Sequence, residues 1–176
     1  MSGEGAAGEH KAKSPAPASI RVALVTASDS RTPATNDGGR LLARLFAEAG
    51  FTVVEELLLV EDLTEMRARV GALARLDVAD AVVVTGGTGL GPRDRTPEAV
   101  SPLFEQQLPG FGELFRMLSF RQIGASAMLS RAEAGIVGGV PVFLLPGSPA
   151  AIDLAVRELI APELPHLIGQ LRRVLS

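Results

Sequence analysis

A strand that ends in a glycine-rich loop is the feature that most constrains the fold of this chain. Residues 80–94 read Asp-Ala-Val-Val-Val-Thr-Gly-Gly-Thr-Gly-Leu-Gly-Pro-Arg-Asp. The apolar, β-branched run predicts a strand that is buried on both faces, as in parallel sheets. Four glycines within the next six residues allow main-chain N–H groups to face an anion at close range. Since ligands lie beyond the carboxyl ends of such strands, this loop is the first candidate site.

Strand and helix patterns alternate through the first half of the chain. Apolar strands are predicted at 20–27, 51–60 and around 81–85, with amphipathic helices between them. Asp37 is the expected N-cap of the first helix, and Asp62 begins a capping-box pattern at the second. Because crossovers of this length join parallel strands, the sequence predicts an α/β fold with a mostly parallel sheet.

The second half shows no internal domain boundary. We expect a helix from Thr96, with its hydroxyl as the cap, a break at 108–112 and a helix over 113–120. Residues 126–131 have a mixed pattern. The remaining expectations are two strands or one hairpin at 134–138 and 141–145 with a Gly138-Gly139 turn, a helix capped by Ser148 with Pro149 first, and a last helix over 162–175.

Composition narrows the classes of protein. Residues 1–19 are rich in Gly, Ala, Ser, Pro and Lys and are predicted to be a disordered tail, which leaves 20–176 as one domain. The tail lacks the apolar region of a secretory signal, and no stretch is long enough to span a membrane. A net charge of -3 and the absence of Trp and Tyr argue against nucleic acid binding. The absence of Cys excludes thiolate sites and suits the cytoplasm.

Three loops that follow strands are expected to meet at one edge of the sheet. They contain Ser28 and Asp29, then residues 85–89, then 146–149. The last loop is also a helix start, where free N–H groups favour an anion, although ordinary capping explains it equally well. The glycine loop matches neither Walker A nor G-x-G-x-x-G, and a tight turn without a ligand is its alternative. The candidate phosphate-binding and substrate-binding residues are Ser28, Asp29, Thr85, Gly86, Gly87, Thr88, Gly89, Pro146, Gly147 and Ser148.

Charged residues near this edge suggest a metal–phosphate site. Asp62 and Asp94 each follow a predicted strand, and Mg²⁺ would relieve their repulsion of each other and of a phosphate. The alternatives are a helix cap for Asp62 and a surface ion pair with a neighbouring arginine for Asp94. Arg93 and Arg131 are the predicted phosphate contacts.

Several motifs in order resemble the MogA/MoaB family, which includes the gephyrin and plant G domains of molybdenum cofactor synthesis. The motifs run from about residue 20 to the final helix, and several in order are far more specific than one glycine loop. They are Thr85-Gly86-Gly87-Thr88-Gly89, Pro92-Arg93-Asp94, Thr96-Pro97-Glu98-Ala99, Leu108-Pro109-Gly110-Phe111, Ala127-Met128-Leu129-Ser130-Arg131, Ala134-Gly135 and Leu145-Pro146-Gly147-Ser148-Pro149.

The resemblance implies a three-layer α/β/α sandwich and adenylylation of molybdopterin by Mg-ATP, with pyrophosphate released. It implies a homo-oligomer, a trimer or in some members a hexamer, and contacts with other molybdenum cofactor biosynthesis proteins. Asp94 takes the place of one family acid, and Asp62 that of the acid in a Val-Pro-Asp motif, which reads Val60-Glu61-Asp62 here. The implied pterin contacts are Thr88, Ser119 and Ser130.

One position departs from many adenylyltransferases of this group. Leu144 stands where they carry Asn, two residues before the late Pro-Gly, and it cannot donate a hydrogen bond to a pterin. An apolar residue there is more typical of the MoaB branch. Two alternatives therefore accompany the enzyme hypothesis: a non-enzymatic molybdopterin-binding or assembly protein, and a molybdate-insertion type of relative on the same fold.

Overall fold

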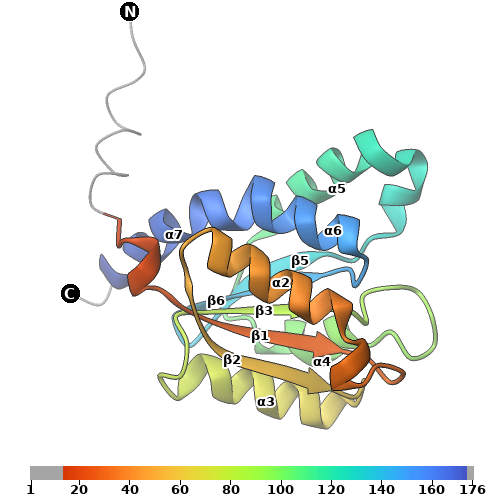
Figure 1. The fold of residues 1–176 in the computed structure, drawn as a ribbon, viewed down its shortest axis with the longest axis horizontal. Coiled ribbons are helices and arrows are strands. Elements are labelled where there is room, and N and C mark those ends of the chain that lie inside the picture. Colours follow the sequence, from red (N-terminus) through yellow and green to blue (C-terminus); the bar gives the residue numbers. More distant parts are fainter. Residues whose placement is uncertain (1–13, 174–176) are drawn as a thin grey trace, which may run out of the picture.

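One mixed sheet organises the computed structural model, which describes residues 14–173 (Figure 1). Its strand order is β2-β1-β3-β6-β5-β4. β2, β1, β3 and β6 are parallel neighbours, whereas β5 is antiparallel to both β6 and β4. The predicted α/β fold with a mostly parallel sheet is thus confirmed. The strands are β1 (Arg21–Ala27), β2 (Thr52–Leu59), β3 (Ala81–Thr85), β4 (Gln106–Gln107), β5 (Glu133–Val137) and β6 (Val140–Leu145).

Helices cover both faces of the sheet, which makes three layers (Figure 1). One face carries α2 (Asp37–Glu48), α5 (Pro109–Ile123), α6 (Pro149–Leu154) and α7 (Ala161–Arg173). The other carries α3 (Leu63–Arg75) and α4 (Thr96–Val100). A π-helical segment, η5 (Ala155–Ile160), joins α6 to α7, and the short 3-10 turns are η1 (Pro17–Ser19), η2 (Pro33–Thr35), η3 (Ser101–Leu103) and η4 (Gly124–Leu129).

The sheet separates two apolar cores, and the alternation of side chains along β3 shows how. Ala81 and Val83 belong to the core beneath α2, α5, α6 and α7, whereas Val82 and Val84 belong to the core beneath α3 and α4. All four side chains are fully buried. The apolar run of the sequence therefore reflects a central strand with cores on both faces, as predicted.

Two predicted helix caps were wrong, and polar contacts explain both. Asn36, not Asp37, caps α2: its Oδ1 accepts a hydrogen bond from Gly39 N at 3.0 Å, while its Nδ2 donates to the Thr26 hydroxyl in β1 at 3.1 Å. A single amide thus fixes the helix start to the sheet, which a carboxylate could not do. Thr96 does not cap α4, because its hydroxyl donates to the Gly86 carbonyl at 2.9 Å.

The expected break at 108–112 is the first turn of α5. Pro109 occupies the first helical position, where the missing N–H has no helical partner to lose. The hairpin interpretation of the late strands is confirmed, since β5 and β6 are antiparallel and Gly138 and Gly139 have positive φ angles of 58° and 80°. Ser148 caps α6, with Pro149 at the start of the helix, also as predicted.

The last residues of the predicted tail are folded. Residues 17–19 form η1, and the Thr52 hydroxyl of β2 donates to the Ala18 carbonyl at 2.9 Å, so this segment is fixed to the sheet edge. Residues 1–13 of the predicted tail, and residues 174–176, where the last helix was expected to end, lie outside the described part. Within 14–173, none of the helices has the length and apolar character needed to cross a membrane.

Candidate functional site

The loops after β1, β3 and β6 meet at one edge of the sheet. These strands are adjacent and parallel, so their carboxyl ends face the same way. A cavity of about 620 Å³ opens there, between the three loops and the α5–η4 segment. The predicted residues that line it are Ser28, Gly86, Gly87, Thr88, Gly89, Asp94, Ser119, Ser130, Pro146, Gly147 and Ser148.

Two glycines fix the first turn of the glycine loop. Gly86 and Gly87 have φ angles of 97° and 62°, which side-chain-bearing residues rarely adopt. A Cβ on Gly86 would lie 2.3 Å from the Ala27 carbonyl oxygen, and one on Gly87 would lie 2.3 Å from the Thr96 hydroxyl. Thr96 is fully buried and its N–H donates to the Gly87 carbonyl at 2.9 Å. The loop therefore folds back closely over β1 and the start of α4.

The second half of the loop surrounds the Asp94 carboxylate. Asp94 Oδ2 accepts a hydrogen bond from Gly91 N at 2.8 Å. A Cβ on Gly89 or Gly91 would lie only 2.6 or 2.7 Å from the same oxygen. Both glycines are thus needed for the chain to wrap this carboxylate, and Asp94 is placed at the lip of the cavity.

Arg131 holds the glycine loop from the η4–β5 side. Its Nη2 donates to the carbonyls of Gly89 and Asp94, both at 2.7 Å, and its Nε donates to the Thr88 carbonyl at 3.3 Å. Its Nη1 pairs with the Glu98 carboxylate. Most N–H groups of Arg131, a predicted phosphate contact, therefore already bind other protein atoms. Arg131 also does not line the cavity at the glycine loop.

Arg93 and Asp29 pair with each other across the edge. Arg93 Nε lies 2.5 Å from Asp29 Oδ2, and Asp29 Oδ1 accepts a hydrogen bond from Glu61 N at 3.0 Å. The Arg93 hydrogen bond, followed by that from Glu61 N–H, holds the pKa of Asp29 below its ordinary value. Neither side chain lines the cavity at the glycine loop. Their contacts instead join the loops after β1, β2 and β3.

The two carboxylates after β2 have different surroundings. Asp62 is the N-cap of α3, and its Oδ1 accepts hydrogen bonds from Thr64 N and Glu65 N at 3.0 and 2.8 Å. Glu61 instead points toward the glycine loop, where its Oε2 lies 3.1 Å from a Cβ built on Gly87. Asp62 is therefore a helix cap in the structure, which was the alternative to a metal-binding role.

Glu61 is a candidate site residue that the sequence reasoning missed. Its Oε2 is buried and has no hydrogen-bond partner within residues 14–173. Burial raises the pKa of Glu61, and the negative charges of Asp94 and Asp29 raise it further, while Arg93 acts in the opposite direction. A signal was present, because this glutamate stands where the family motif has proline.

The hydroxyls implied as pterin contacts are brought together in the cavity. Thr88 and Ser119 are 3% and 7% exposed, and both line it together with Ser130. Arg31, which the sequence reasoning did not select, also lines it beside the α6 N-terminus. The Thr85 hydroxyl lies behind the lining and donates to the Pro146 carbonyl at 3.1 Å, which ties two of the loops together.

Leu144 lies outside this cavity, in the apolar core. Its side chain is fully buried and belongs to the apolar core on the α3 side of the sheet, and it does not line the large cavity. The departure from the family pattern at this position is thus a feature of the core in this chain. It does not remove a polar group from the cavity wall.

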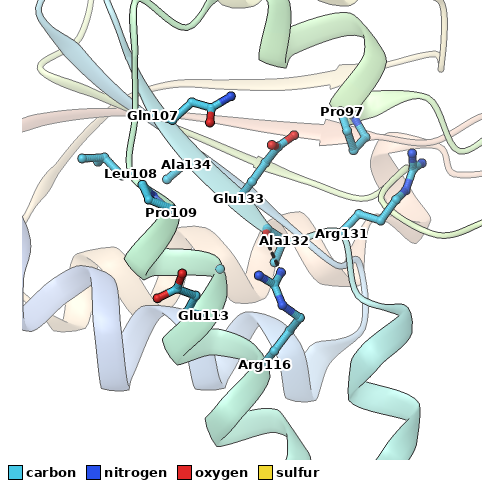
Figure 2. A pocket seen from close by; sticks show the side chains of 11 residues that line it. Pro97, Gln107, Leu108, Pro109, Glu113, Arg116, Arg131, Ala132, Glu133 and Ala134 are labelled. Atoms are coloured by element: carbon cyan, nitrogen blue, oxygen red, sulfur yellow. Dashed lines mark hydrogen bonds between the residues drawn. The ribbon is translucent and has the colours of Figure 1, made fainter.

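A separate cavity of about 370 Å³ lies between the starts of α4 and α5 and the strand β5 (Figure 2). Arg116 lies beside it and donates to the Ala132 carbonyl at 3.0 Å (Figure 2). The Glu133 carboxylate accepts the Ser101 hydroxyl. Because the carboxylates of Glu113 and Glu133 line it, this cavity suits an anion less well than the glycine-loop edge does.

The glycine-loop edge offers oxygen ligands of the kind that Mg²⁺ binds. Within the described residues, no group of three or more His, Asp or Glu side chains is placed to hold a metal ion. Mg²⁺ sites on phosphate substrates commonly need only one or two carboxylates, with the phosphates and water completing the shell. Asp94, which lines the cavity, fits such a partial site.

Comparison with known proteins gives a consistent result. Residues 23–166 match the family described as “Probable molybdopterin binding domain”. Molybdenum cofactor biosynthesis protein B of Bacillus subtilis (strain 168) is 41% identical over 166 residues, which are 94% of this chain and 96% of that protein.

Solved structures agree with this match. A crystal structure of a molybdenum cofactor biosynthesis protein B is 44% identical, with a TM-score of 0.86 over 90% of this chain and 99% of the other. The tungsten cofactor synthesizing protein MoaB from Pyrococcus furiosus is 34% identical, with a TM-score of 0.78 over 89% and 99% of the two chains. The chain therefore belongs to the MogA/MoaB family of molybdenum cofactor biosynthesis proteins.

Proposed function

We propose that this protein acts in molybdenum cofactor biosynthesis as a cytoplasmic molybdopterin adenylyltransferase, which transfers AMP from Mg-ATP to molybdopterin. Family membership supports the biosynthetic role. The finer assignment is supported by one observation above all: the Asp94 carboxylate, the glycine-loop amides and the N-terminus of α6 border the same cavity. These are groups that bind phosphates and their metal ion.

In this proposal, a terminal phosphate oxygen of molybdopterin attacks the α-phosphorus of ATP. A new P–O bond forms to the pterin phosphate, the bond between the α-phosphorus and the bridging oxygen breaks, and pyrophosphate leaves. Bound Mg²⁺ supplies charge neutralisation at the phosphate oxygens. The protein itself positions the two phosphates, since phosphoryl transfer needs orientation and electrostatic stabilisation more than covalent help.

The described side chains divide this work. Main-chain N–H groups of Gly87 to Gly89 and of the α6 start are the proposed phosphate donors, and Arg31 adds positive charge beside α6. Thr88, Ser119 and Ser130 are the proposed pterin contacts, because their hydroxyls lie in a partly apolar wall formed with Ile123 and Leu129. Asp94 is the proposed Mg²⁺ ligand.

We also propose that the protein is a homo-oligomer, with a trimer expected first and a hexamer as the alternative, and that other molybdenum cofactor biosynthesis proteins are its further partners. Apolar side chains on α5 and η4 support self-association, because Phe120 and Met128 are 60% and 78% exposed. Met117 and Ile123 are about half exposed on the same segment. Sedimentation analysis tests this proposal: Phe120→Glu should give monomers, and a monomeric wild-type protein would contradict it.

The enzymatic proposal is tested by mixing purified protein, molybdopterin and Mg-ATP and measuring pyrophosphate. Release that needs all three components, and that Asp94→Asn abolishes, is the expected result. Asp77→Asn, at the opposite end of the sheet, is the matched control and should retain activity. Molybdopterin binding without pyrophosphate release would instead indicate a binding or assembly protein. Molybdate-dependent release of AMP from the adenylylated pterin would indicate an insertion enzyme.

A further inference from the structure

We propose that Arg31 binds the phosphate group of molybdopterin and thereby selects the phosphorylated form of the pterin as substrate. This inference rests on the proposed function, because it names the residue that recognises one of the two proposed substrates. None of the motifs quoted above contains Arg31, and the loop after β1 entered the candidate site through Ser28 and Asp29 alone. The charge, the contacts and the position of the Arg31 side chain support the assignment.

The charges of the cavity at the glycine loop are divided between two side chains. Among the described residues that line it, Arg31 is the one basic side chain and Asp94 is the one acidic side chain. In the proposed reaction Mg²⁺ accompanies ATP, so a carboxylate such as Asp94 suits the metal-bound phosphates. The phosphate monoester of the pterin brings no metal ion, and it therefore needs a cationic donor from the protein. Arg31 is the lining side chain that can supply one.

The guanidinium of Arg31 is not used by the protein itself. Within residues 14–173, it donates no hydrogen bond and forms no ion pair. Its main chain is nevertheless fixed, because the Ser28 hydroxyl accepts hydrogen bonds from Ser30 N at 3.3 Å and from Arg31 N at 3.2 Å. Arg93 and Arg131, by contrast, are both held in ion pairs. Arg31 thus keeps the planar set of donors that can bind two phosphate oxygens at once.

Arg31 reaches the region where α2 and α6 begin. Its Nη1 lies 3.7 Å from the position that a Cβ on Gly38 would occupy, in the first turn of α2. That position is also 3.6 Å from the Gly147 carbonyl oxygen, just before α6. The N-terminus of α2 carries partial positive charge, and Asp37, the acid of its first turn, is already paired with Arg40. Because a cationic side chain is repelled there, the arrangement favours an anion bound beside it.

A solvated surface arginine is the competing explanation, and ligand binding separates the two. Full-length wild-type protein and Arg31→Ala are equilibrated with molybdopterin under anaerobic conditions, and the free pterin is measured after ultrafiltration. The titration is repeated with molybdopterin from which a phosphatase has removed the phosphate, and with a non-hydrolysable ATP analogue and Mg²⁺. Arg44→Ala, which removes the same charge from an exposed position on α2, is the matched control.

Arg31→Ala should weaken the binding of molybdopterin by tenfold or more, because the phosphate loses its cationic donor. The variant should change the binding of the dephosphorylated pterin and of the ATP analogue by less than twofold. Its Tm should match that of the wild type, since the guanidinium has no partner to lose within the described residues. Arg44→Ala should change the binding of all three ligands by less than twofold.

Unchanged molybdopterin binding by Arg31→Ala would overturn the inference, and so would an equal loss for the dephosphorylated pterin, for the ATP analogue or in Arg44→Ala. A lower Tm with weaker binding of every ligand would overturn it in favour of a structural role. Because these readouts do not depend on turnover, the two proposals fail separately. Arg31-dependent binding without pyrophosphate release would refute only the transferase. Pyrophosphate release by Arg31→Ala at wild-type affinity for molybdopterin would refute only the role of Arg31.

Discussion

The Nη2 atom of Arg131 lies 2.7 Å from the main-chain carbonyl oxygen of Asp94 and donates a hydrogen bond to it. The same atom donates to the Gly89 carbonyl, so one guanidinium connects both ends of the segment that carries the acidic residue. Arg131 is therefore a positioning residue for the glycine loop. The assignment as a phosphate contact, which its charge suggested, would require these hydrogen bonds to be exchanged for ligand contacts.

Arg131→Ala should loosen the glycine loop and leave the rest of the fold in place. Three loop carbonyls lose their hydrogen-bond donor. Glu98 loses its ion-pair partner: burial raises the pKa of this carboxyl, but the hydrogen bond and charge of Arg131 lower it below its ordinary value. We expect a loss of about 1–3 kcal/mol in the free energy of unfolding. Hydrogen exchange should accelerate over residues 86–95. Arg69→Ala, at an exposed position on α3, is the control. Unchanged exchange in the loop would refute the positioning role.

Gly86→Ala should destabilise the protein through the backbone. The new Cβ would lie 2.3 Å from the Ala27 carbonyl oxygen, at a φ angle of 97°. The expected loss is about 2–4 kcal/mol, measured by urea unfolding. Gly110→Ala is the control, because a Cβ there meets no atom within 4 Å in the first turn of α5. Equal stabilities of the two variants would contradict the described loop.

Much of this architecture could be predicted because the pattern of apolar residues determines it. The run at Ala81 to Val84 identified the central strand, and the strand–helix alternation gave the parallel order around it. The edge strand β4 could not be predicted, since Gln106 and Gln107 have no apolar periodicity and pair only through their main chains with β5.

Individual side-chain roles were harder to predict for a physical reason. Asp62 and Glu61 are neighbours in the sequence, and spacing alone cannot show which one caps a helix and which one faces a loop. The Thr96 hydroxyl matches a capping pattern, but in the structure it donates a hydrogen bond to the Gly86 carbonyl, ten residues earlier in the chain. Many of the residues named from the motifs line one cavity, whereas the hydrogen-bond partners of each polar group depended on the tertiary structure.

Leu144→Asn should weaken the fold without creating a pterin contact. The leucine is fully buried among apolar side chains on the α3 side of the sheet. An amide there leaves its polar atoms unsatisfied and removes apolar packing, which costs about 2–4 kcal/mol. Leu76→Asn, at a position that is 71% exposed, should change the unfolding free energy little. Tighter molybdopterin binding by Leu144→Asn at unchanged stability would contradict this account.

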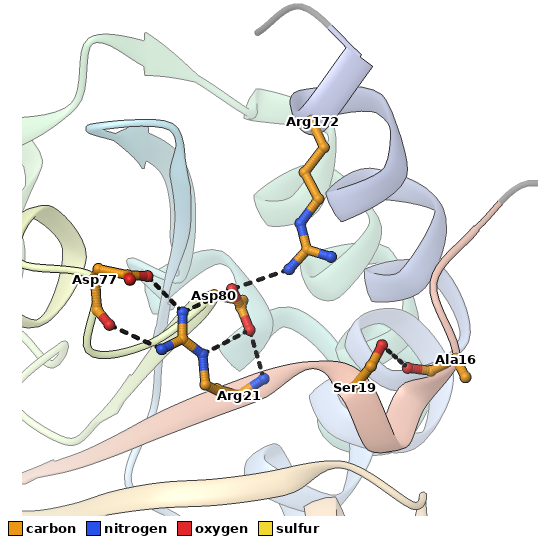
Figure 3. A network of polar contacts seen from close by, with 6 residues as sticks. All are labelled: Ala16, Ser19, Arg21, Asp77, Asp80 and Arg172. Carbon is orange, nitrogen blue, oxygen red and sulfur yellow. Dashed lines mark hydrogen bonds and ion pairs between the residues drawn. The ribbon is translucent and has the colours of Figure 1, made fainter. Parts of the chain in front are cut away.

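An ion network at the opposite end of the sheet predicts a pH dependence of stability. Asp80 accepts hydrogen bonds from Arg21 N at 2.8 Å and from Arg172 Nη2 at 3.0 Å (Figure 3). Burial raises the pKa of Asp80, but the hydrogen bonds and charge of Arg21, with the charge of Arg172, outweigh it and lower the pKa below 3.8. Ionised Asp80 thus stabilises the fold above about pH 4, and protonation removes that stabilisation as the pH falls through the folded-state pKa.

Asp80→Asn should therefore lower the free energy of unfolding by about 2 kcal/mol at pH 7, and the difference from wild type should shrink below pH 4. Urea unfolding at a series of pH values measures both effects. Asp77→Asn, whose native carboxylate is 92% exposed and also contacts Arg21, should show a smaller loss. A stability difference between Asp80→Asn and wild type that grows as the pH falls would contradict the lowered pKa of Asp80.

The measurement that tests the central claim most directly is identification of the reaction product by mass spectrometry. Purified protein is incubated with molybdopterin and Mg-ATP, beside Asp94→Asn. The variant keeps an oxygen that can accept the Gly91 N–H but loses the negative charge, so it should fold normally. The account predicts molybdopterin that carries AMP on its terminal phosphate from the wild-type protein, and none from Asp94→Asn. Adenylylated pterin from Asp94→Asn at the wild-type rate, or none from a wild-type protein that binds both substrates, would contradict it.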